Sequence, residues 1–510
     1  MNRRIIYLLV LLLAIGQGGC KKFLDVKPLD QLSGNSFFQD RNDVEDNLWD
    51  TYGLIRDKLG TCPFLPASGD LRSGMMAKSP EDGDGNRNYL NYIPQNQLNT
   101  LVTSGDANGN MDGTFHWGNL TTWEPFYQAI EAANILYDAL ERGQVQGLSA
   151  ADVKRYEGEA VFIRCISYFI MIRIWGDVPY YTTPYQQDAL PRMDMVQVAK
   201  NCIDDLSKVV NDLPWTYSDP AYLGIRASRG SALALLQELA MWNAGFDKAN
   251  AQKYWQETAD WGEQIVKSNA YALLPIEQFH TIFQGRTQES LFEFAQNSNY
   301  GEIIMYQTFP DMVLHFPYKR PAATHQYSFT YFRPDFLHML YPDQSDARIQ
   351  YWFDQDMYAG NGNFQFLKFT NIYAISDGED VNPDGDIMMF RYAGAILMTA
   401  EAYADLGGTT NETEAKKLLN MVRGRSNALP YTGAGGKVLQ DAIFAERAKE
   451  LMGEGHYYFD LVRTGRVMDP TWDFYPLTQA QFNERAWTWP LNASVQHNNP
   501  YIQLNSYWLQ

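Results

Sequence analysis

Apolar residues recur at helical spacing over most of this 510-residue chain. In the segment 43–59, for example, Val44, Leu48 and Ile55 fall on one face of a helix. The same period predicts further helices over 121–142, 149–175, 196–213, 228–242, 251–268, 391–406, 412–427 and 437–452. Ser149 and Asp152 have the spacing of an N-terminal cap, and Gly176 stops the helix that follows them. The pattern predicts a mainly α protein.

Two pairs of these helices are joined by very short turns. SRGSALALLQELAMWNAG leads into NAQKYWQETADWGEQIVKS, and RYAGAILMTAEAYADLGG leads into NETEAKKLLNMVRGRS. Small residues alternate with large ones, which allows two helix backbones to approach closely. This arrangement is typical of tetratricopeptide-like helical hairpins. No strict self-match at a fixed period is visible, so the packing is expected to be repeat-like rather than a regular solenoid.

Two stretches, 60–117 and 297–383, lack the helical period. The first is rich in Gly, Asn, Asp and Ser, and the second is rich in Tyr and Phe and interrupted by Pro. Long loops in a compact domain are usually functional or disordered. Because these loops carry aromatic and polar side chains, we expect them to bind ligand.

The charge balance excludes nucleic acid as the main partner. The chain has 41 basic and 60 acidic side chains, a formal charge of −19, and no basic stripe after its first four residues. Phosphate binding requires clustered Lys and Arg. The 72 aromatic residues (27 Phe, 13 Trp and 32 Tyr) suit stacking on flat ligand faces, although most of them must form core.

The N-terminus has the form of a bacterial lipoprotein signal. Arg3 and Arg4 precede an apolar run over 5–15, which is too short to span a bilayer, and Gly18-Gly19 leads into Cys20. We therefore expect residues 1–19 to be a signal peptide and Cys20 to be acylated, so that the protein meets the membrane only through its acyl anchor. An ordinary signal peptide with an incidental Cys20 is the alternative.

Three cysteines remain after Cys20, so at most one disulfide is possible. Cys165 and Cys202 lie in apolar helical patterns and are expected to be buried thiols, while Cys62 is the third. The seven histidines are scattered, and neither a CxxC nor an HExxH motif occurs. The sequence predicts no metal centre of these kinds.

Six segments, in order, resemble the SusD/RagB family of outer-membrane nutrient-binding lipoproteins. They are CKKFLDVKPLDQLSGNSFF, WEPFYQAIEAANILYDAL, GEAVFIRCISYFIMIRIWGDVPYY, RYAGAILMTAEAYADLGG with LLNMVRGRSN, ERAKELMGEGHYYFDLVRTGR and WPLNASVQHNNPYIQLNSYW. Two positions depart from the family pattern, Cys165 in place of Ala and His456 in place of Arg. The resemblance covers nearly the whole chain.

The resemblance implies binding without catalysis. Members are α-helical lids that capture oligosaccharides, or sometimes peptides, at the cell surface and pass them to a SusC-like TonB-dependent β-barrel transporter. It implies one compact unit, with an N-terminal part at 20–215 and a C-terminal part at 216–510. It also implies a lipid-anchored location on the exposed side of the outer membrane.

Charged residues crowd the segment ERAKELMGEGHYYFDLVRTGR and could suggest catalytic carboxylates. Their spacing around apolar residues favours a buried ion-pair network that locks the last helix pair against the C-terminal tail. The residues concerned are Glu446, Arg447, Glu450, Glu454, Asp460 and Arg463.

Candidate ligand-binding residues come from the two loops. In the first, Asp70 and Arg72 could form a hydroxyl-binding pair, and Trp117 with Asn119 could supply a stacking platform and an amide. In the second, the candidate platforms are Tyr300, Tyr306, Phe309, Tyr318, Tyr327 and Tyr331. For any one of these aromatics, packing within the protein is the competing explanation.

An acidic, glycine-containing loop over 377–386, DGEDVNPDGD, offers oxygen ligands of the kind that calcium prefers. It lacks the spacing of an EF-hand, so a solvated turn is the favoured interpretation. We expect no cofactor, with calcium as a weak possibility at this loop.

Two other functions compete with glycan capture. A helical glycoside hydrolase would need two carboxylates about 5–10 Å apart across the sugar, a spacing that sequence cannot reveal across loops. A helical scaffold that binds only protein would explain the hairpins but not the two aromatic loops. No nucleophile elbow, zinc motif or phosphate loop supports another chemistry.

Overall fold

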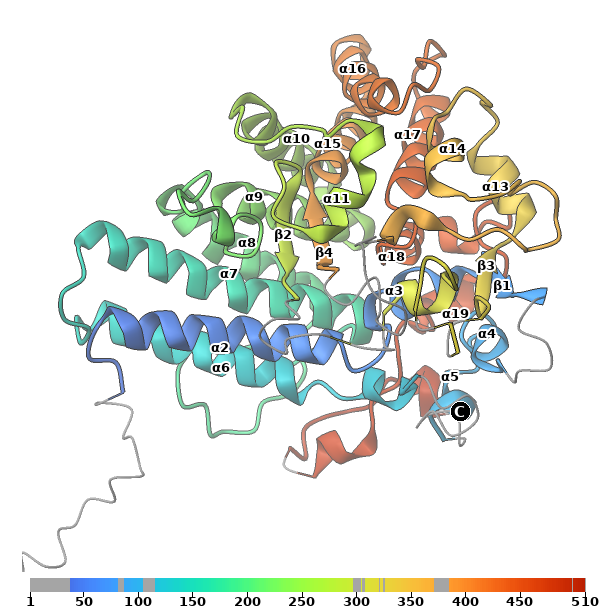
Figure 1. Ribbon diagram of the computed structural model, residues 1–510. Helices are drawn as coiled ribbons and strands as arrows, with labels where there is room; N and C mark the ends of the chain where they lie inside the picture. Colours follow the sequence, from blue (N-terminus) through green and yellow to red (C-terminus); the bar gives the residue numbers. More distant parts are fainter. Residues whose placement is uncertain are drawn as a thin grey trace, which may run out of the picture.

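The computed structural model describes residues 37–80, 87–103, 115–296, 304, 308–320, 322–323, 326–370, 385–497 and 499–509. Nine long helices dominate these ranges, one for each helix that the sequence predicts (Figure 1). They are α2 (Arg41–Leu59), α6 (Glu124–Glu141), α7 (Ala150–Trp175), α8 (Met195–Val209), α9 (Arg229–Phe246), α10 (Ala251–Lys267), α15 (Tyr392–Leu406), α16 (Thr409–Arg425) and α17 (Lys437–Glu450). The mainly α prediction is confirmed. None of the described helices combines the length and apolarity needed to cross a membrane.

Local sequence signals set the ends of the central helix, α7. Ser149 Oγ accepts from the Asp152 amide at 3.1 Å, and Asp152 Oδ2 accepts from the Ser149 amide at 3.3 Å. This capping box satisfies backbone donors that the first helical turn leaves unpaired. Gly176, with φ +73°, ends the helix in a conformation that a side chain would disfavour.

The helices form antiparallel hairpins that stack into a layered array. α6 lies against α7, α9 against α10 and α15 against α16, while α10 also packs on α15. In Figure 1 the array rises from α2, α6 and α7 through α8, α9 and α10 to α15 and α16. Where α10 meets α15, a Cβ built on Gly262 would lie 1.8 Å from Thr399 Oγ1. The close approach explains why the hairpins require small residues on facing sides.

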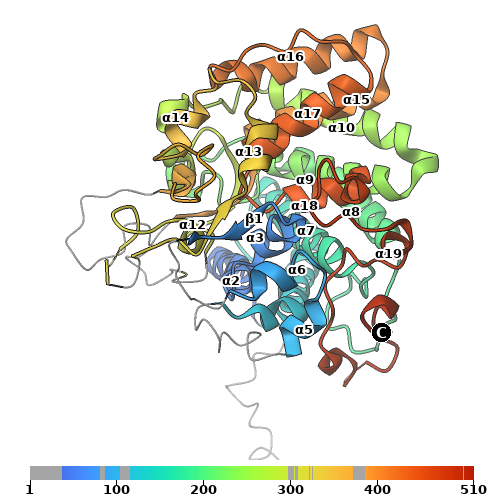
Figure 2. The same cartoon turned by 90° about the vertical axis from the view of Figure 1, so that its right-hand side faces the viewer.

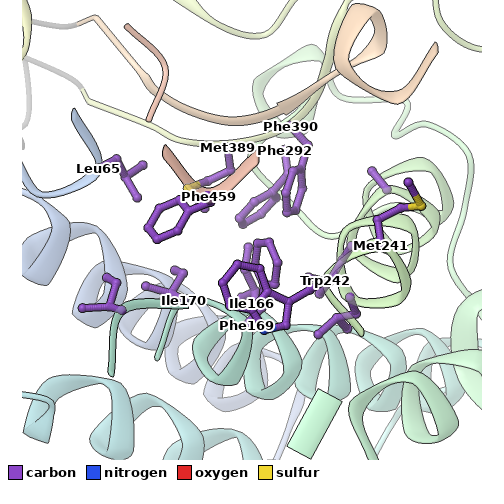
Figure 3. Packing of buried hydrophobic residues seen from close by; sticks show 14 of the residues in the cluster. Leu65, Ile166, Phe169, Ile170, Met241, Trp242, Phe292, Met389, Phe390 and Phe459 are labelled. Carbon is purple, nitrogen blue, oxygen red and sulfur yellow. The ribbon is translucent and has the colours of Figure 1, made fainter. Parts of the chain in front are cut away.

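A continuous apolar core fills the space between α7 and the elements above it. Every residue of α7 from Tyr156 to Trp175 is buried, because other elements cover all of its faces. Figure 3 shows Phe169 of α7 facing Phe292, Phe390 and Phe459 from later parts of the chain. The ring centroids of Phe169 and Phe390 lie 6.0 Å apart, and those of Phe162 and Phe292 lie 4.8 Å apart in an edge-on arrangement; these contacts add to the burial of apolar area.

Two short antiparallel ribbons, which the sequence did not predict, join distant segments. β1 (Met76–Lys78) pairs with β3 (Thr330–Phe332), and β2 (Ser290–Phe294) pairs with β4 (Ile387–Arg391). The β1–β3 ribbon links the two loops that sequence singled out as ligand-binding. These loops therefore share one side of the molecule, seen in Figure 2 beside α12 and α13.

The two loops are less irregular than expected, because they contain short helices. In the first loop these are α3 (Phe64–Gly69), η2 (Leu71–Ser73), α4 (Tyr89–Tyr92), α5 (Leu98–Thr103) and η5 (Trp117–Thr121). In the second they are α12 (Pro310–Val313), α13 (Pro334–Leu340), α14 (Arg348–Trp352) and η11 (Leu367–Phe369). The remaining described helices of more than one turn are α11 (Phe279–Gln284), α18 (Tyr457–Thr464) and α19 (Gln479–Asn483).

The predicted ion-pair network around α17 and α18 is present and buried. Glu450 contacts Arg348 and Arg391 at 2.7 Å each, and also Arg425. Burial alone would raise the pKa of Glu450, but these three cations hold it well below its usual value. The network joins α17 to α14, β4 and α16, so the expectation that it locks against the C-terminal tail was wrong. The charges are structural.

Candidate functional site

The loop side of the molecule carries an open hollow of about 520 Å³. Its described wall consists of His315, Phe316, Ala322, Ala323, Gln326 and Tyr327. Phe316 is 42% exposed and Tyr327 is 37% exposed, which is unusual for rings of this size. Concave sites of about 300–1,000 Å³ with aromatic walls and a few polar groups are the usual form of small-ligand sites.

His315 gives the hollow a polar group held in a defined orientation. Its backbone amide donates to Gln365 Oε1 at 2.6 Å, and its Nδ1 lies 2.9 Å from Ser328 Oγ, which donates to the Val313 carbonyl. Burial lowers the pKa of His315, so the imidazole is neutral at pH 7. With Nδ1 donating to Ser328, the neutral ring carries its acceptor lone pair on the other nitrogen.

A continuous set of aromatic rings stands behind the exposed Tyr327. Its ring centroid lies 6.3 Å from Phe329, which lies 6.1 Å from Phe115, which lies 5.2 Å from Trp117. The guanidinium of Arg87 sits 4.2 Å from the Phe329 centroid and adds a cation–π contact. The rings fix the position of the segment that bears Tyr327, although they come from both loops.

Asp70 and Arg72 do not form the hydroxyl-binding pair that the sequence suggested. Asp70 is buried, and its Oδ2 accepts from the Gly455 amide at 2.8 Å. Arg72 is also buried and donates to the carbonyls of Ala486 and Thr488 at 3.0 and 3.1 Å. Both side chains direct their polar atoms to distant backbone, so they stabilise the fold.

Trp117 and Asn119 are likewise internal supports. Trp117 is 1% exposed, and its ring packs 5.0 Å from Tyr89 within the aromatic interior. Asn119 is half-buried and donates to the Thr61 carbonyl at 3.1 Å, which ties η5 to the end of α2. A ring without an exposed face cannot stack on a sugar, so the platform predicted at Trp117 was wrong.

The candidate aromatics of the second loop have different positions. Tyr327 lines the hollow, whereas Tyr318 and Tyr331 are half-buried nearby, Tyr331 with its ring 5.9 Å from Phe364. Phe309 is buried and lines a different, mostly apolar pocket of about 90 Å³. Tyr300 and Tyr306, like Cys20, lie outside the described residues.

Sequence reasoning missed His315, Phe316 and Gln326. Phe316 precedes Pro317 in a segment with charged neighbours, HFPYKR, and this context was the available signal that the ring faces solvent. Which aromatics of the loop are exposed depends on the β1–β3 pairing, which the sequence pattern did not reveal.

The described residues also bear on the expectations for metal binding and for the cysteines. No group of three or more His, Cys, Asp or Glu side chains within them is arranged to hold a metal ion. Cys62, Cys165 and Cys202 are buried thiols, as expected for the last two. Most of the acidic loop over 377–386 falls outside the described ranges. Asp386 lies within them and is buried against Glu293.

Comparisons with known proteins agree with the resemblance seen in the sequence. The model of the SusD family matches residues 354–509, and a model described as "Starch-binding associating with outer membrane" matches residues 77–240. SusD-like protein P38 of Formosa agariphila is 24% identical over 98% of this chain and 99% of its own length.

Solved structures extend the similarity to the whole fold. A SusD homolog from Bacteroides thetaiotaomicron is 37% identical, with a TM-score of 0.83, and the match covers 92% of this chain and 100% of that one. A laminarin-binding SusD-like protein is 21% identical, with a TM-score of 0.68 over 92% of this chain and 100% of that one. At this lower identity the likeness concerns the fold alone. The helical hairpins, the sequence motifs and the 37% identical relative together show that the chain belongs to the SusD/RagB family.

Proposed function

We propose that this protein is a surface glycan-binding lipoprotein that captures an oligosaccharide in the loop hollow and delivers it to a SusC-like TonB-dependent transporter. The observation that carries the proposal is the exposed pair Phe316 and Tyr327 on the wall of a hollow of about 520 Å³. Aromatic faces stack on the apolar faces of sugar rings, while the exposed amide of Gln326 offers a partner for hydroxyls. Family membership and the names of the laminarin-binding neighbour and the starch-binding model support this ligand class.

The composition of the hollow favours binding over hydrolysis. None of its described wall residues is an Asp or a Glu. Glycoside hydrolysis requires a pair of carboxylates flanking the scissile bond. We therefore propose capture without catalysis and without a cofactor, with calcium at 377–386 as the one untested addition.

The proposed location follows from the N-terminus and the family. Acylation of Cys20 would anchor the chain, and the description "associating with outer membrane" of the matching model supports the membrane concerned. A Cys20→Ser variant should lose its membrane association in cell fractionation. Delivery to a transporter predicts that a β-barrel protein co-purifies with the full-length chain from solubilised outer membranes.

The direct test is calorimetry of the soluble form from Lys21 onward against neutral and acidic polysaccharides. We expect one polysaccharide class to bind without release of product. Phe316→Ala and Tyr327→Ala should each weaken that binding about tenfold, because each removes a stacking face. Tyr501→Ala is the matched control, since Tyr501 is 60% exposed but lies outside the hollow.

Other outcomes would separate the alternatives. Product formation from a bound glycan would overturn the absence of catalysis. Binding of peptides in place of glycans would keep the capture role and change the cargo. If removal of the loops abolished only the binding of the barrel partner, the protein would be a scaffold that binds protein alone.

A further inference from the structure

A second cleft, of about 720 Å³, lies between α2 and the end of β2, apart from the loop hollow. Trp49, Tyr52 and Arg56 of α2 line one wall, and Arg286, Glu293 and Phe294 line the other. Tyr222, at the end of the short helix η7 (Pro220–Tyr222), completes the first wall. In Figure 1 the lower end of β2 points down across α7 toward α2. The described walls of the cleft and of the loop hollow have no residue in common.

Trp49 and Tyr222 form a braced aromatic surface in this cleft. Their centroids are 5.6 Å apart with an interplanar angle of 40°, and both side chains are half-buried. The guanidinium of Arg226 lies 5.5 Å from the Trp49 centroid and 5.2 Å from the Tyr222 centroid. Arg226 is buried and absent from the cleft wall, so it supports the rings from beneath.

The position of Arg226 is itself fixed by charge. Its guanidinium pairs with Glu159 at 2.9 Å and Glu45 at 2.7 Å, and these carboxylates raise its pKa even though burial lowers it. A cation held in this way keeps both rings in place before any ligand binds. Preorganised rings lose little conformational entropy on binding.

Polar groups surround the rings with balanced charge. Asp50 and Asp57 on the exposed rim are matched by Arg56 and Arg286 on the walls. Carboxylates and guanidinium groups are planar and can bind adjacent hydroxyls in pairs. Glu293 adds a further carboxyl group to these charges, so the wall has no excess of positive charge, and the cleft favours a neutral polar ligand over an anion.

Two further observations decide the class of ligand. Trp49 is a half-buried residue of the cleft wall, and within the described ranges its indole N–H makes no hydrogen bond to the protein, so this donor is available to a ligand. The outer edge of β2 is already used, since the Glu293 amide donates to the Gly224 carbonyl at 2.9 Å. A peptide could not add as a strand there at that residue.

We infer that this cleft is a second saccharide-binding site, which takes a neutral oligosaccharide with a ring stacked on Trp49 and Tyr222. The inference rests on the proposed function for its ligand class but uses separate residues. Two separate sites would hold a long glycan at two points and raise its apparent affinity without new contacts at either site.

The test measures stoichiometry by calorimetry with short neutral oligosaccharides derived from laminarin, starch and xylan. We expect the soluble wild-type chain to bind about two molecules of one of these. Tyr222→Ala and Arg286→Ala, on opposite walls, should each remove one of the two sites or weaken it about tenfold. Trp49→Phe keeps an aromatic ring against Tyr222, and loss of the indole N–H should weaken the same site. Tyr327→Ala should remove or weaken the site in the loop hollow. Tyr501→Ala should leave both sites unchanged.

The outcomes distinguish the two proposals. If Tyr222→Ala and Arg286→Ala bind like the wild type while Tyr327→Ala loses all binding, the second site does not exist and the proposed function stands. If Tyr327→Ala has no effect and Tyr222→Ala loses binding, the cleft is the glycan site and the role of the loop hollow is refuted. If the folded wild-type chain binds none of the oligosaccharides or their parent polysaccharides, both proposals fail. Thermal melting of each variant confirms that it is folded.

Discussion

Arg72 illustrates how a single buried cation can hold distant parts of this chain together. It donates to Asn96 Oδ1 at 2.7 Å and to two carbonyls of the C-terminal segment, and it lies over the rings of Tyr458 and Trp489. Burial lowers the pKa of its guanidinium, which remains charged at neutral pH. The cost of that buried charge is offset only while all these partners are in place.

We predict that Arg72→Met lowers the free energy of unfolding by about 2–4 kcal/mol, because several buried acceptors lose their donor together. Urea denaturation of the soluble form measures this. Arg142→Met is the control: Arg142 is 57% exposed in its pair with Asp138, and its loss should cost less than about 0.5 kcal/mol. If Arg72→Met kept its stability and lost glycan binding instead, Arg72 would be a ligand residue after all.

Assignment of individual residues was the least predictable part of the structure. Asp70, Arg72 and Trp117 occur in a polar, glycine-rich loop, where such residue types often contact ligand. Their partners are far away in sequence, since Arg72 and Thr488 are 416 positions apart. Periodicity carries no information about contacts of that separation, so burial could not be anticipated.

At the scale of elements, tight helix contacts depend on glycine. The missing side chain of Gly262 on α10 leaves room for the hydrogen bond of 3.0 Å between Gln237 Nε2 and Thr399 Oγ1. A Cβ there would lie 2.5 Å from the Gln237 nitrogen as well as 1.8 Å from the Thr399 oxygen. The close packing of α9, α10 and α15 therefore requires a glycine at position 262.

We predict that Gly262→Ala destabilises the protein by about 1–3 kcal/mol, since it overpacks the contact and breaks that hydrogen bond. Gly424→Ala in α16 is the matched control, because a Cβ added at Gly424 would meet nothing within 4 Å, and alanine should stabilise the helix by up to about 1 kcal/mol. Calorimetric melting compares the two. Combining Gly262→Ala with Thr399→Ala should recover part of the loss, and equal effects of both glycine substitutions would refute the packing argument.

Helices were predictable from the sequence, whereas strand pairing was not. The ends of α7, α10 and α17 fall within two residues of expectation, because the apolar period and the caps are local signals. β1 and β3 are short segments brought together across about half of the chain. Their pairing decides which loop residues become exposed. Of the predicted platforms that lie within the described residues, only Tyr327 therefore lines the hollow.

Across the whole molecule, buried carboxyl groups fall into two classes with opposite pH dependence. Burial raises the pKa of Asp70, Glu293 and Asp473 to about 7. For Glu454 and Asp460, burial acts in the same direction, but neighbouring Arg and Lys side chains outweigh it and bring the pKa to about 2. Unfolded carboxyl groups titrate near pH 4.

The first class binds protons more tightly in the folded state. Its contribution to stability is complete below about pH 4 and is lost as the pH rises through about 7. The second class binds protons less tightly in the folded state, so its contribution is complete above about pH 4 and is lost as the pH falls through about 2. Stability should therefore be greatest at mildly acidic pH, between these two losses.

Glu293 offers a direct test, because its carboxyl group is buried with that of Asp386, burial raises the pKa of both, and within the described residues Glu293 Oε2 and Asp386 Oδ2 have no hydrogen-bond donor, so the pair must hold a proton. Glu293→Gln replaces that proton with an amide donor of the same shape. We predict that the variant is more stable than the wild type at pH 8. Between pH 5 and 8 its free energy of unfolding should also fall less than that of the wild type. The difference in slope is about 1.4 kcal/mol per pH unit for each proton that the wild type takes up on folding and the variant does not. Melting curves from pH 3 to 9 measure this, with Glu414→Gln on the surface of α16 as the control. A parallel pH profile for Glu293→Gln and the wild type would show that this pair is not protonated in the folded chain.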